Sequence, residues 1–257
     1  MRRRWIVLIV LAVLVAGFML AWHPWSRLSI DQSSVILEAT PGVTAPAGRD
    51  DVMAVVYSGD GGWADLDKQL GNDFAESGIP VLGISTFKYY WHERSPEASA
   101  RDLDAIMTRY LARWNKKRIW LVGFSFGADV LPSIVERLSP ANRARINQLV
   151  LLSPSHDVNF EIELEGYMIS GWFASHVKSL FEWVNPVRHY DSKPLLLALD
   201  GQPPVVCYYP KNEDTDSVCD DPGLPPWIVV HPIPGDHHLG GDYHALARRL
   251  VDGIPSR

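Results

Sequence analysis

The feature of this sequence that most limits its fold is a series of short aliphatic runs along residues 50–230. Each run is only a few residues long, and most are separated by turn formers or by helical patterns. Such brief apolar runs are typical of parallel strands that are buried on both faces of a sheet. We expect strands at residues 52–57, 81–84, 119–122, 149–152, 195–199, 205–209 and 228–230.

Helical patterns lie between several of these runs. Apolar residues in the segment 103–114 recur at spacings of three and four, and Ser95 followed by Pro96 supplies an N-cap and a first helical turn. A second stripe, over residues 243–251, closes the chain, whereas residues 26–49 are rich in Pro and Gly and predict an irregular lead-in. The alternation predicts an open α/β sheet, mostly parallel and covered by helices on both faces, with its reactive groups at the carboxyl ends of strands.

The first 25 residues form a separate unit. Three arginines at positions 2–4 precede an uninterrupted apolar run from Trp5 to Trp22, which as a helix would cover most of a hydrocarbon core about 30 Å thick. Positive charge before such a run predicts that the rest of the chain is exported across the membrane. We favour an uncleaved signal anchor over a cleaved signal peptide, because residues 18–20 are too large for a cleavage site.

Composition bounds the remaining possibilities. The chain has 257 residues, of which 47% are hydrophobic, so residues 50–257 suit one large globular domain rather than a disordered or coiled-coil architecture. A net charge of −6 argues against nucleic acid as a partner, since phosphate backbones would repel the body of the protein. The chain has only two cysteines, and no pair of its histidines has the helical spacing of a zinc site. We therefore expect no metal and no cofactor.

One strand end carries a candidate nucleophile. A G-x-S-x-G pattern made by Gly123, Ser125 and Gly127 follows the aliphatic run at 119–122 directly and opens a helical segment. This order is typical of a nucleophile elbow, in which glycines permit a tight turn and the serine hydroxyl is exposed. The amide of Phe126 would then point at a developing oxyanion. Pro132, seven residues after the serine, predicts that the new helix is kinked or ends early.

An elbow requires an acid and then a histidine later in the chain. The histidine should lie on a loop after the last strand, and of the nine histidines only His237 and His238 fit, in the segment 234–242 between the strand expected at 228–230 and the final helical stripe. One of them should act as general base and then as general acid. Spacing does not decide between the two rings, and we favour His237 slightly, with His238 as a packing or substrate-contacting neighbour.

The acid should follow the strand expected at 205–209. The next residues offer three carboxylates: Glu213 and Asp214 rank equally, and Asp216 ranks third. The same segment contains both cysteines of the chain, Cys207 and Cys219. Their spacing of twelve residues, together with export, favours a local disulfide over two free thiols. Such a disulfide would hold the acid-bearing loop in place.

A glycine-rich loop, Ser58-Gly59-Asp60-Gly61-Gly62-Trp63, follows the strand expected at 52–57. Backbone amides in such a loop can approach a substrate closely, so Gly59 and Asp60 are candidates for the second oxyanion donor. A phosphate cradle is the competing interpretation, but the loop lacks the Lys-Ser/Thr ending that a nucleotide loop needs.

The motifs together resemble a known family. They are the glycine-rich loop, the aromatic block Lys88-Tyr89-Tyr90-Trp91 with residues 94–97 after it, the elbow segment 123–132, the Cys207 to Cys219 segment, and residues 235–238. This combination resembles the VirJ/AcvB family of bacterial virulence proteins over about residues 50–257. The resemblance implies an α/β-hydrolase fold in the bacterial periplasm, next to the inner membrane. For characterised relatives it implies hydrolysis of aminoacyl-phosphatidylglycerol, chiefly lysyl-phosphatidylglycerol, and it suggests secretion-system proteins as further partners.

The residues are compatible with a membrane phospholipid substrate of that kind. Asp60 and Asp129 are candidates for attracting a cationic head group, Tyr90 and Trp91 for contacting the substrate, and Asp129 also suits its helix amino terminus. Residues 155–192, rich in aromatics, form either a small cap insertion or a buried aromatic cluster. A non-catalytic binding protein or secretion chaperone on the same fold, and a less specific carboxylesterase or thioesterase, remain alternatives.

Overall fold

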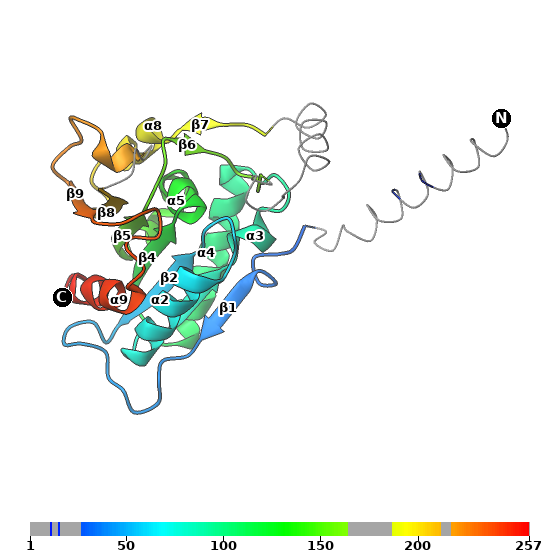
Figure 1. The fold of residues 1–257 in the computed structure, drawn as a ribbon. Helices are drawn as coiled ribbons and strands as arrows, with labels where there is room; N and C mark the ends of the chain where they lie inside the picture. Colours follow the sequence, from blue (N-terminus) through cyan, green and yellow to red (C-terminus); the bar gives the residue numbers. More distant parts are fainter. Residues whose placement is uncertain (1–10, 12–14, 16–26, 164–186, 212–216, 257) are drawn as a thin grey trace, which may run out of the picture.

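The structure, a computed structural model, describes residues 27–163, 187–211 and 217–256, together with Leu11 and Val15 (Figure 1). Apart from those two positions, the signal anchor expected at residues 1–25 lies outside the described residues. Within the described part of the chain, no helix combines the length and the apolar character that crossing a membrane requires.

A seven-stranded sheet forms the centre of the domain, in the order β1-β3-β2-β4-β5-β8-β9. All neighbouring strands are parallel except β1, which runs antiparallel to β3 at one edge. The bounds are β1 Ser34–Leu37, β2 Val52–Tyr57, β3 Val81–Ile84, β4 Arg118–Phe124, β5 Ile146–Leu152, β8 Val205–Pro210 and β9 Ile228–Ile233. The mostly parallel sheet expected from the aliphatic runs is therefore confirmed.

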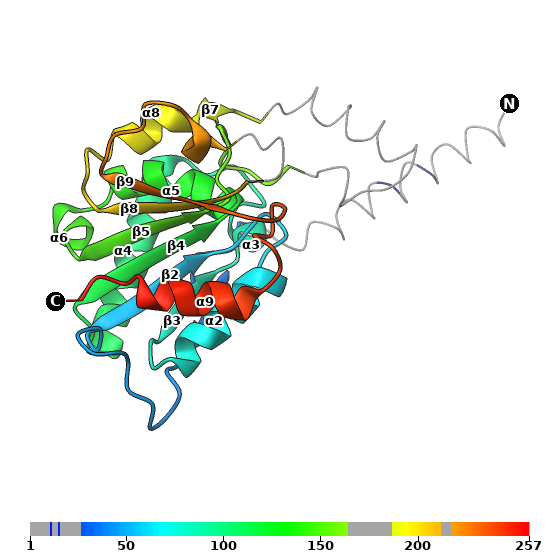
Figure 2. The same cartoon turned by 60° about the vertical axis from the view of Figure 1, so that its left-hand side comes forward.

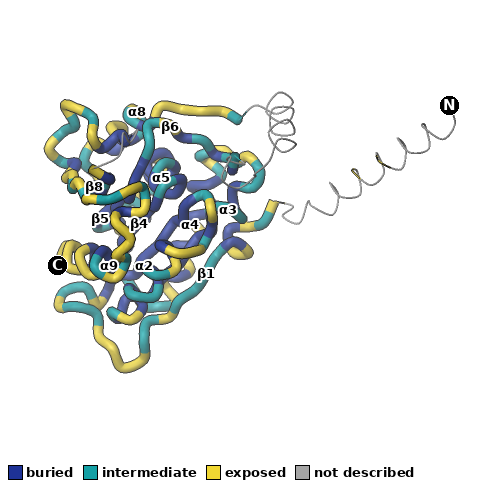
Figure 3. Tube along the Cα trace, viewed as in Figure 1, coloured by how far each residue is buried: buried dark blue, intermediate teal, exposed yellow. Residues whose placement is uncertain are grey.

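Helices cover both faces of this sheet (Figures 1 and 2). On one face α2 (Asp65–Glu76) lies beside α9 (Tyr243–Asp252), and the other face carries α4 (Pro96–Arg113), α5 (Phe126–Glu136) and α8 (Ser192–Leu197). Side chains alternate along β2, so that Val52, Ala54 and Val56 join the first core layer and Met53, Val55 and Tyr57 join the second. Both layers are buried, as Figure 3 shows along the strands.

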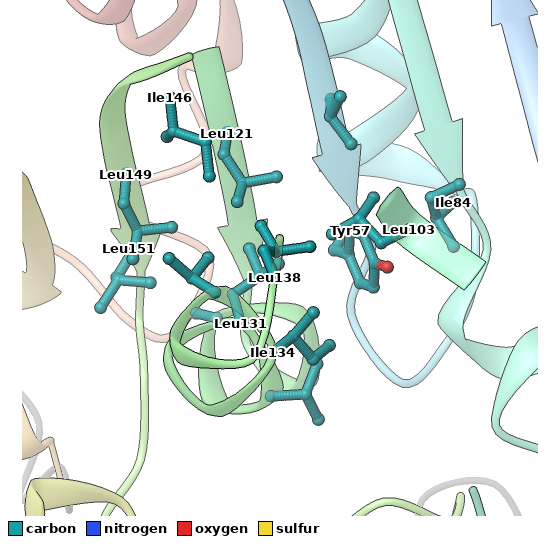
Figure 4. Packing of buried hydrophobic residues seen from close by; sticks show 14 of the residues in the cluster. Tyr57, Ile84, Leu103, Leu121, Leu131, Ile134, Leu138, Ile146, Leu149 and Leu151 are labelled. Atoms are coloured by element: carbon teal, nitrogen blue, oxygen red, sulfur yellow. The ribbon is translucent and has the colours of Figure 1, made fainter. Parts of the chain in front are cut away.

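The layer around α5 illustrates the packing that fixes the helix to the sheet. Leu131 and Ile134 of α5 face Leu121 of β4 and Leu149 and Leu151 of β5, and each of these side chains is at most 1% exposed (Figure 4). Burying one such side chain contributes about 1.5–3 kcal/mol, and the cost of truncating it to alanine is about 2–5 kcal/mol. This contact holds α5 against β4 and β5.

Two expectations from the sequence are wrong, and a third is wrong in one of its two alternatives. Residues 195–199 were expected as a strand, but Leu195–Leu197 lie in α8, which Asp191 caps by accepting a hydrogen bond from the Lys193 amide at 3.0 Å. A five-residue apolar run suits a buried helix as well as a strand, and Pro194 fits a first helical turn. The lead-in at 26–49, expected to be irregular, contains strand β1. Of the kink or early end expected at Pro132, the early end does not occur, because α5 continues to Glu136.

The predicted N-cap is confirmed, since Ser95 Oγ accepts a hydrogen bond from the Ala98 amide at 3.2 Å at the start of α4. Two short strands, β6 (Asp157–Val158) and β7 (Tyr190–Asp191), pair antiparallel at the base of the region expected as a cap. Residues 164–186 of that region lie outside the described residues. The other short elements are α3 Thr86–Tyr89, α6 Pro140–Arg143 and the 3-10 turn η1 Val218–Asp220.

Candidate active site

Ser125 lies in a strained turn between β4 and α5. Its φ of 50° and ψ of −121° place a residue with a side chain in the left-handed half of conformational space. The two flanking glycines are required by contact: a Cβ on Gly123 would lie 2.6 Å from the Gly127 carbonyl oxygen, and one on Gly127 would lie 2.5 Å from the Tyr57 carbonyl oxygen. The G-x-S-x-G segment therefore has the geometry expected of a nucleophile elbow.

The ring of His237 reaches this serine. Its Nε2 lies 2.9 Å from Ser125 Oγ, although the two residues are 112 positions apart in the sequence. The main chain of His237 is fixed by Ser153, whose Oγ donates a hydrogen bond to the His237 carbonyl oxygen at 2.8 Å. The neighbouring ring of His238 turns elsewhere, and its Nδ1 lies 3.4 Å from the Tyr243 hydroxyl. Of the two candidate histidines, the structure brings His237 to the serine.

The three carboxylates expected to serve as the acid, Glu213, Asp214 and Asp216, lie outside the described residues. The strands that precede the two loops are described. The strand before the carboxylates, β8, is the neighbour of β9, the strand before the histidines, and the Lys211 amide donates to the Ile233 carbonyl at 2.8 Å. The acid-bearing segment and the histidine loop thus leave the sheet from adjacent strands. The predicted disulfide between Cys207 and Cys219 is confirmed, and it connects β8 to η1 across that segment.

Two of the three predicted oxyanion donors have clear positions. Phe126 is the first residue of α5, so its amide is among the helix N–H groups that have no partner within the helix. The Gly59 amide, by contrast, is directed at Asp67 Oδ2, 3.4 Å away, and this bond takes it out of the role we predicted. Asp60 follows directly in the loop, and its Oδ1 accepts the Gly61 amide at 2.9 Å.

The sequence matches the model of a family described as bacterial virulence protein (VirJ) over residues 51–257. The chain belongs to the VirJ family. No match is found among curated protein sequences.

Solved structures show that this VirJ-family chain has the α/β-hydrolase fold. A homologue of α/β serine hydrolases from Coxiella burnetii has 15% identity and a TM-score of 0.54, with 86% of this chain and 91% of that chain covered. Est1E from Butyrivibrio proteoclasticus has 10% identity and a TM-score of 0.52, with 85% and 91% covered. A soluble variant of monoglyceride lipase from Saccharomyces cerevisiae has 9% identity and a TM-score of 0.52, with 87% and 92% covered. At these identities the likeness concerns the fold alone.

Sequence reasoning assigned no role to several residues that shape the site of this VirJ-family protein. Asp67 is only 3% exposed, and burial raises the pKa of its carboxyl group well above the ordinary range, while the Gly59 amide partly offsets this effect. Thr86 and Ser58 are fully buried beside the glycine-rich loop. The sequence signal for Ser58 and Thr86 was only their place just after the ends of strands, and Asp67 in the first turn of α2 carried none.

Asp129 lies one turn into α5, close to the elbow. Its Oδ1 accepts the Ser155 amide at 2.7 Å, and desolvation raises the pKa of its carboxyl group to about 8, with smaller contributions from Asp157 and Asp60. At neutral pH this carboxyl group is therefore mostly protonated when no cation is bound. It is a weaker attractor of cations than the sequence alone implied.

The aromatic block divides into a core residue and a partly exposed one. Tyr90 is fully buried, with its ring 5.3 Å from that of Phe126, so it packs behind the elbow and does not face a substrate as we predicted. Trp91 is only half-buried and packs against Phe87, with the ring centroids 5.1 Å apart. Trp91 alone of the pair remains a candidate for substrate contact.

A cleft elsewhere on this VirJ-family protein does not involve the serine. It has a volume of about 280 Å³ and lies between the start of α4 and strand β7. Charged side chains of both signs line it, among them Arg94, Glu97, Arg137 and Glu161, and none of the predicted catalytic residues in the described part of the chain does so.

Proposed function

We propose that this VirJ-family protein is a membrane-anchored serine hydrolase of the bacterial periplasm that cleaves the ester bond of aminoacyl-phosphatidylglycerol, with lysyl-phosphatidylglycerol favoured. The observation that carries the proposal is the 2.9 Å contact between His237 Nε2 and Ser125 Oγ at a strained elbow. The reaction class rests on that contact, and the substrate class rests on the resemblance described above.

The chemistry begins with Ser125 attacking the ester carbonyl carbon while its proton passes to His237 Nε2. The carbonyl oxygen then carries negative charge, which the amide of Phe126 stabilises, with Asp60 as the proposed second donor. When the intermediate collapses, the carbon–oxygen bond to the glycerol breaks and the leaving oxygen takes the proton from His237. A water molecule, deprotonated in turn by His237, then attacks the acyl carbon. The bond between that carbon and Ser125 Oγ breaks, the amino acid leaves, and Ser125 Oγ takes its proton back from His237. A carboxylate among Glu213, Asp214 and Asp216 would orient the ring.

The surroundings of the serine suit an ester that carries an ammonium group. Asp60 and Asp129 are near enough to each other that the charge of one affects the pKa of the other. A cation bound near both would favour the ionised form of Asp129, so its binding would release a proton from this carboxyl group.

The path of the chain supports a lipid substrate. Because β1 is antiparallel, its first residue, Ser34, is level with Ile84, the last residue of β3. Ile84 pairs with Tyr57, and Tyr57 pairs with Gly123, two residues before the serine. The chain therefore enters the sheet, at the start of β1, on the same side as Ser125. An apolar segment embedded in a membrane ahead of residue 27 would hold that side toward lipid. The disulfide agrees with an oxidising compartment.

A lipid hydrolysis assay tests this proposal. The full chain in detergent micelles is given labelled lysyl-phosphatidylglycerol, alanyl-phosphatidylglycerol and an unmodified phospholipid, with Ser125→Ala as the control. We expect release of the amino acid from the aminoacyl lipids by the wild type, and loss of activity in Ser125→Ala by at least about 10⁴-fold. Equal turnover of all three lipids would contradict the substrate assignment and leave a general esterase.

The second candidate is a binding protein or secretion chaperone that retains the fold without catalysis. Labelling with a fluorophosphonate separates the two, because the probe reacts only with an activated serine. The catalytic proposal expects labelling of the wild type and none of Ser125→Ala. An unlabelled wild type that is folded would favour the binding protein.

A further inference from the structure

The loop that follows β2 contains an arrangement that the proposed mechanism does not yet use. Gly59 lies directly beside the nucleophile, since a Cβ built on it would be 3.7 Å from Ser125 Cβ and 3.2 Å from the ring of Phe124. Its peptide groups therefore border the place where an oxyanion would form. How these groups are oriented decides which of them faces that place.

Both sides of Gly59 are held by hydrogen bonds. Its carbonyl oxygen accepts from Thr86 Oγ1, from Ser58 Oγ at 2.9 Å and from the Gly62 amide at 3.0 Å. Its amide is directed at Asp67 Oδ2. The two hydroxyl groups also contact each other at 3.0 Å, and Ser58 Oγ accepts the Thr86 amide at 3.0 Å.

The direction of the carbonyl fixes that of the next amide. A peptide group is planar and trans, so the Asp60 N–H points opposite to the Gly59 C=O. The carbonyl points at Thr86, which is fully buried at the start of α3. The Asp60 amide therefore points away from α3, while Gly59 itself abuts Ser125.

We propose that Thr86, assisted by Ser58, is a positioning residue that holds the Asp60 amide in the orientation of an oxyanion donor. Thr86 does not touch the substrate and acts only through the Gly59–Asp60 peptide group. Without the hydroxyl hydrogen bond this peptide can rotate, because glycine tolerates a wide range of backbone angles. The inference rests on the proposed serine hydrolase function and adds a determinant of its transition-state stabilisation.

Thr86→Val tests the inference, because it removes the hydroxyl and keeps the branched shape. The full chain in detergent is assayed with p-nitrophenyl butyrate, beside Thr86→Ser and an exposed control, Thr44→Val. Loss of one oxyanion donor lowers kcat by about 10²–10³-fold, so misorienting a donor should lower it by about tenfold or more. We expect KM to change less than about twofold, Thr86→Ser to recover most of kcat, and Thr44→Val to match the wild type.

A transition-state analogue separates positioning from general damage. The adduct of a trifluoromethyl ketone with serine carries the oxyanion, so its inhibition constant should rise in Thr86→Val by the same factor by which kcat/KM falls. A folded Thr86→Val protein with kcat within about twofold of the wild type would overturn the inference. If Thr86→Val does not fold, Ser58→Ala takes its place with the same expected direction and the same overturning result. A wild type that neither hydrolyses the ester nor reacts with a fluorophosphonate would instead overturn the proposed function, and this inference with it.

Discussion

The two ends of the parallel strands differ in how they are built. We call the side of the sheet where these strands begin the amino edge and the side where they end the carboxyl edge. At the amino edge, Arg118 begins β4 and donates to Asp51 Oδ1 from Nε at 2.9 Å and from Nη2 at 2.6 Å, and to the Pro255 carbonyl at 3.0 Å. Arg49 donates from Nε at 2.8 Å to the Ile254 carbonyl beside it. These bonds connect strand starts to the carboxyl-terminal segment, and charged groups there are matched by partners.

At the carboxyl edge the backbone is strained and carboxyl groups are buried. Ser125, Ser153 and Leu239 all have φ near +50°, which is costly for serine and leucine. By contrast, Asn115 and Asp200, with φ of 51° and 49° before β4 and β8, are residue types that tolerate this conformation. Asp67 and Asp129 both have pKa values raised by burial. The difference indicates that the amino edge stabilises the domain, whereas the strained backbone and buried carboxyl groups of the carboxyl edge lower its stability and maintain the geometry of the site.

The largest expected effect concerns the two histidines of the carboxyl edge. His237→Gln removes the ring that contacts Ser125, and activity should fall by at least about 10³-fold. His238→Gln, whose ring contacts Tyr243, should change kcat by less than about tenfold. Ester hydrolysis by both variants, with thermal unfolding as a check of folding, measures the difference. Equal losses in two folded variants would break the assignment of the base to His237.

The next largest expected effect is a loss of stability at the amino edge. Arg118→Met removes two charge-assisted hydrogen bonds from Asp51, whose side chain is only 9% exposed, and should lower the free energy of unfolding by about 2–4 kcal/mol. Activity of the folded protein at 25 °C should stay within about twofold of the wild type. Urea unfolding measures the first quantity and ester hydrolysis the second.

Arg113→Met is the matched control for that variant. Arg113 forms an ion pair with Glu38 in which each side chain is 55% exposed, and such pairs contribute about 0–1 kcal/mol to the free energy of unfolding. A loss as small for Arg118→Met as for Arg113→Met would show that the amino edge is not the stabilising region.

Much of the fold could be predicted because it depends on local patterns. The strands β2 and β3 match the expected ranges 52–57 and 81–84 at both ends, since fully buried strands need unbroken aliphatic runs. The failures depend on the rest of the molecule. The run at 195–199 is helical because the Asp191 cap and a packing site on α5 decide between two suitable conformations. Strand β1 exists because β3 offers it an open edge.

The site divides in the same way. The elbow around Ser125 and the late histidine loop are visible as motifs, because the tight turn needs glycines at fixed positions. The choice of His237 over His238 depends on the turn angles of that loop, where Gly235 has a φ of 127°, and on contacts with Ser153. Thr86 could not be found from the sequence, because its contact with Gly59 follows from the pairing of β2 with β3.

The smallest expected effect, taken per pH unit, is a dependence of stability on pH at the carboxyl edge. Burial raises the pKa of Asp129 from an ordinary value of 3.8 to about 8. Between these two values the folded chain holds a proton that the unfolded chain has released, so stability falls as the pH rises through this window. The slope is at most about 1.4 kcal/mol per pH unit, so we expect a loss on the order of 1 kcal/mol for each pH unit between pH 5 and pH 7, levelling off near pH 8.

Asp129→Asn should remove this dependence, because the carboxamide resembles the protonated acid and its oxygen can still accept the Ser155 amide. The variant should match the wild type in urea unfolding near pH 5 and exceed it near pH 8, whereas the exposed control Asp200→Asn should follow the wild type at both. If the wild type instead gains stability over Asp129→Asn as the pH rises, the carboxylate is stabilised in the folded state. The carboxyl edge would then carry a fixed negative charge at neutral pH, and its attraction for an ammonium group would need no proton release.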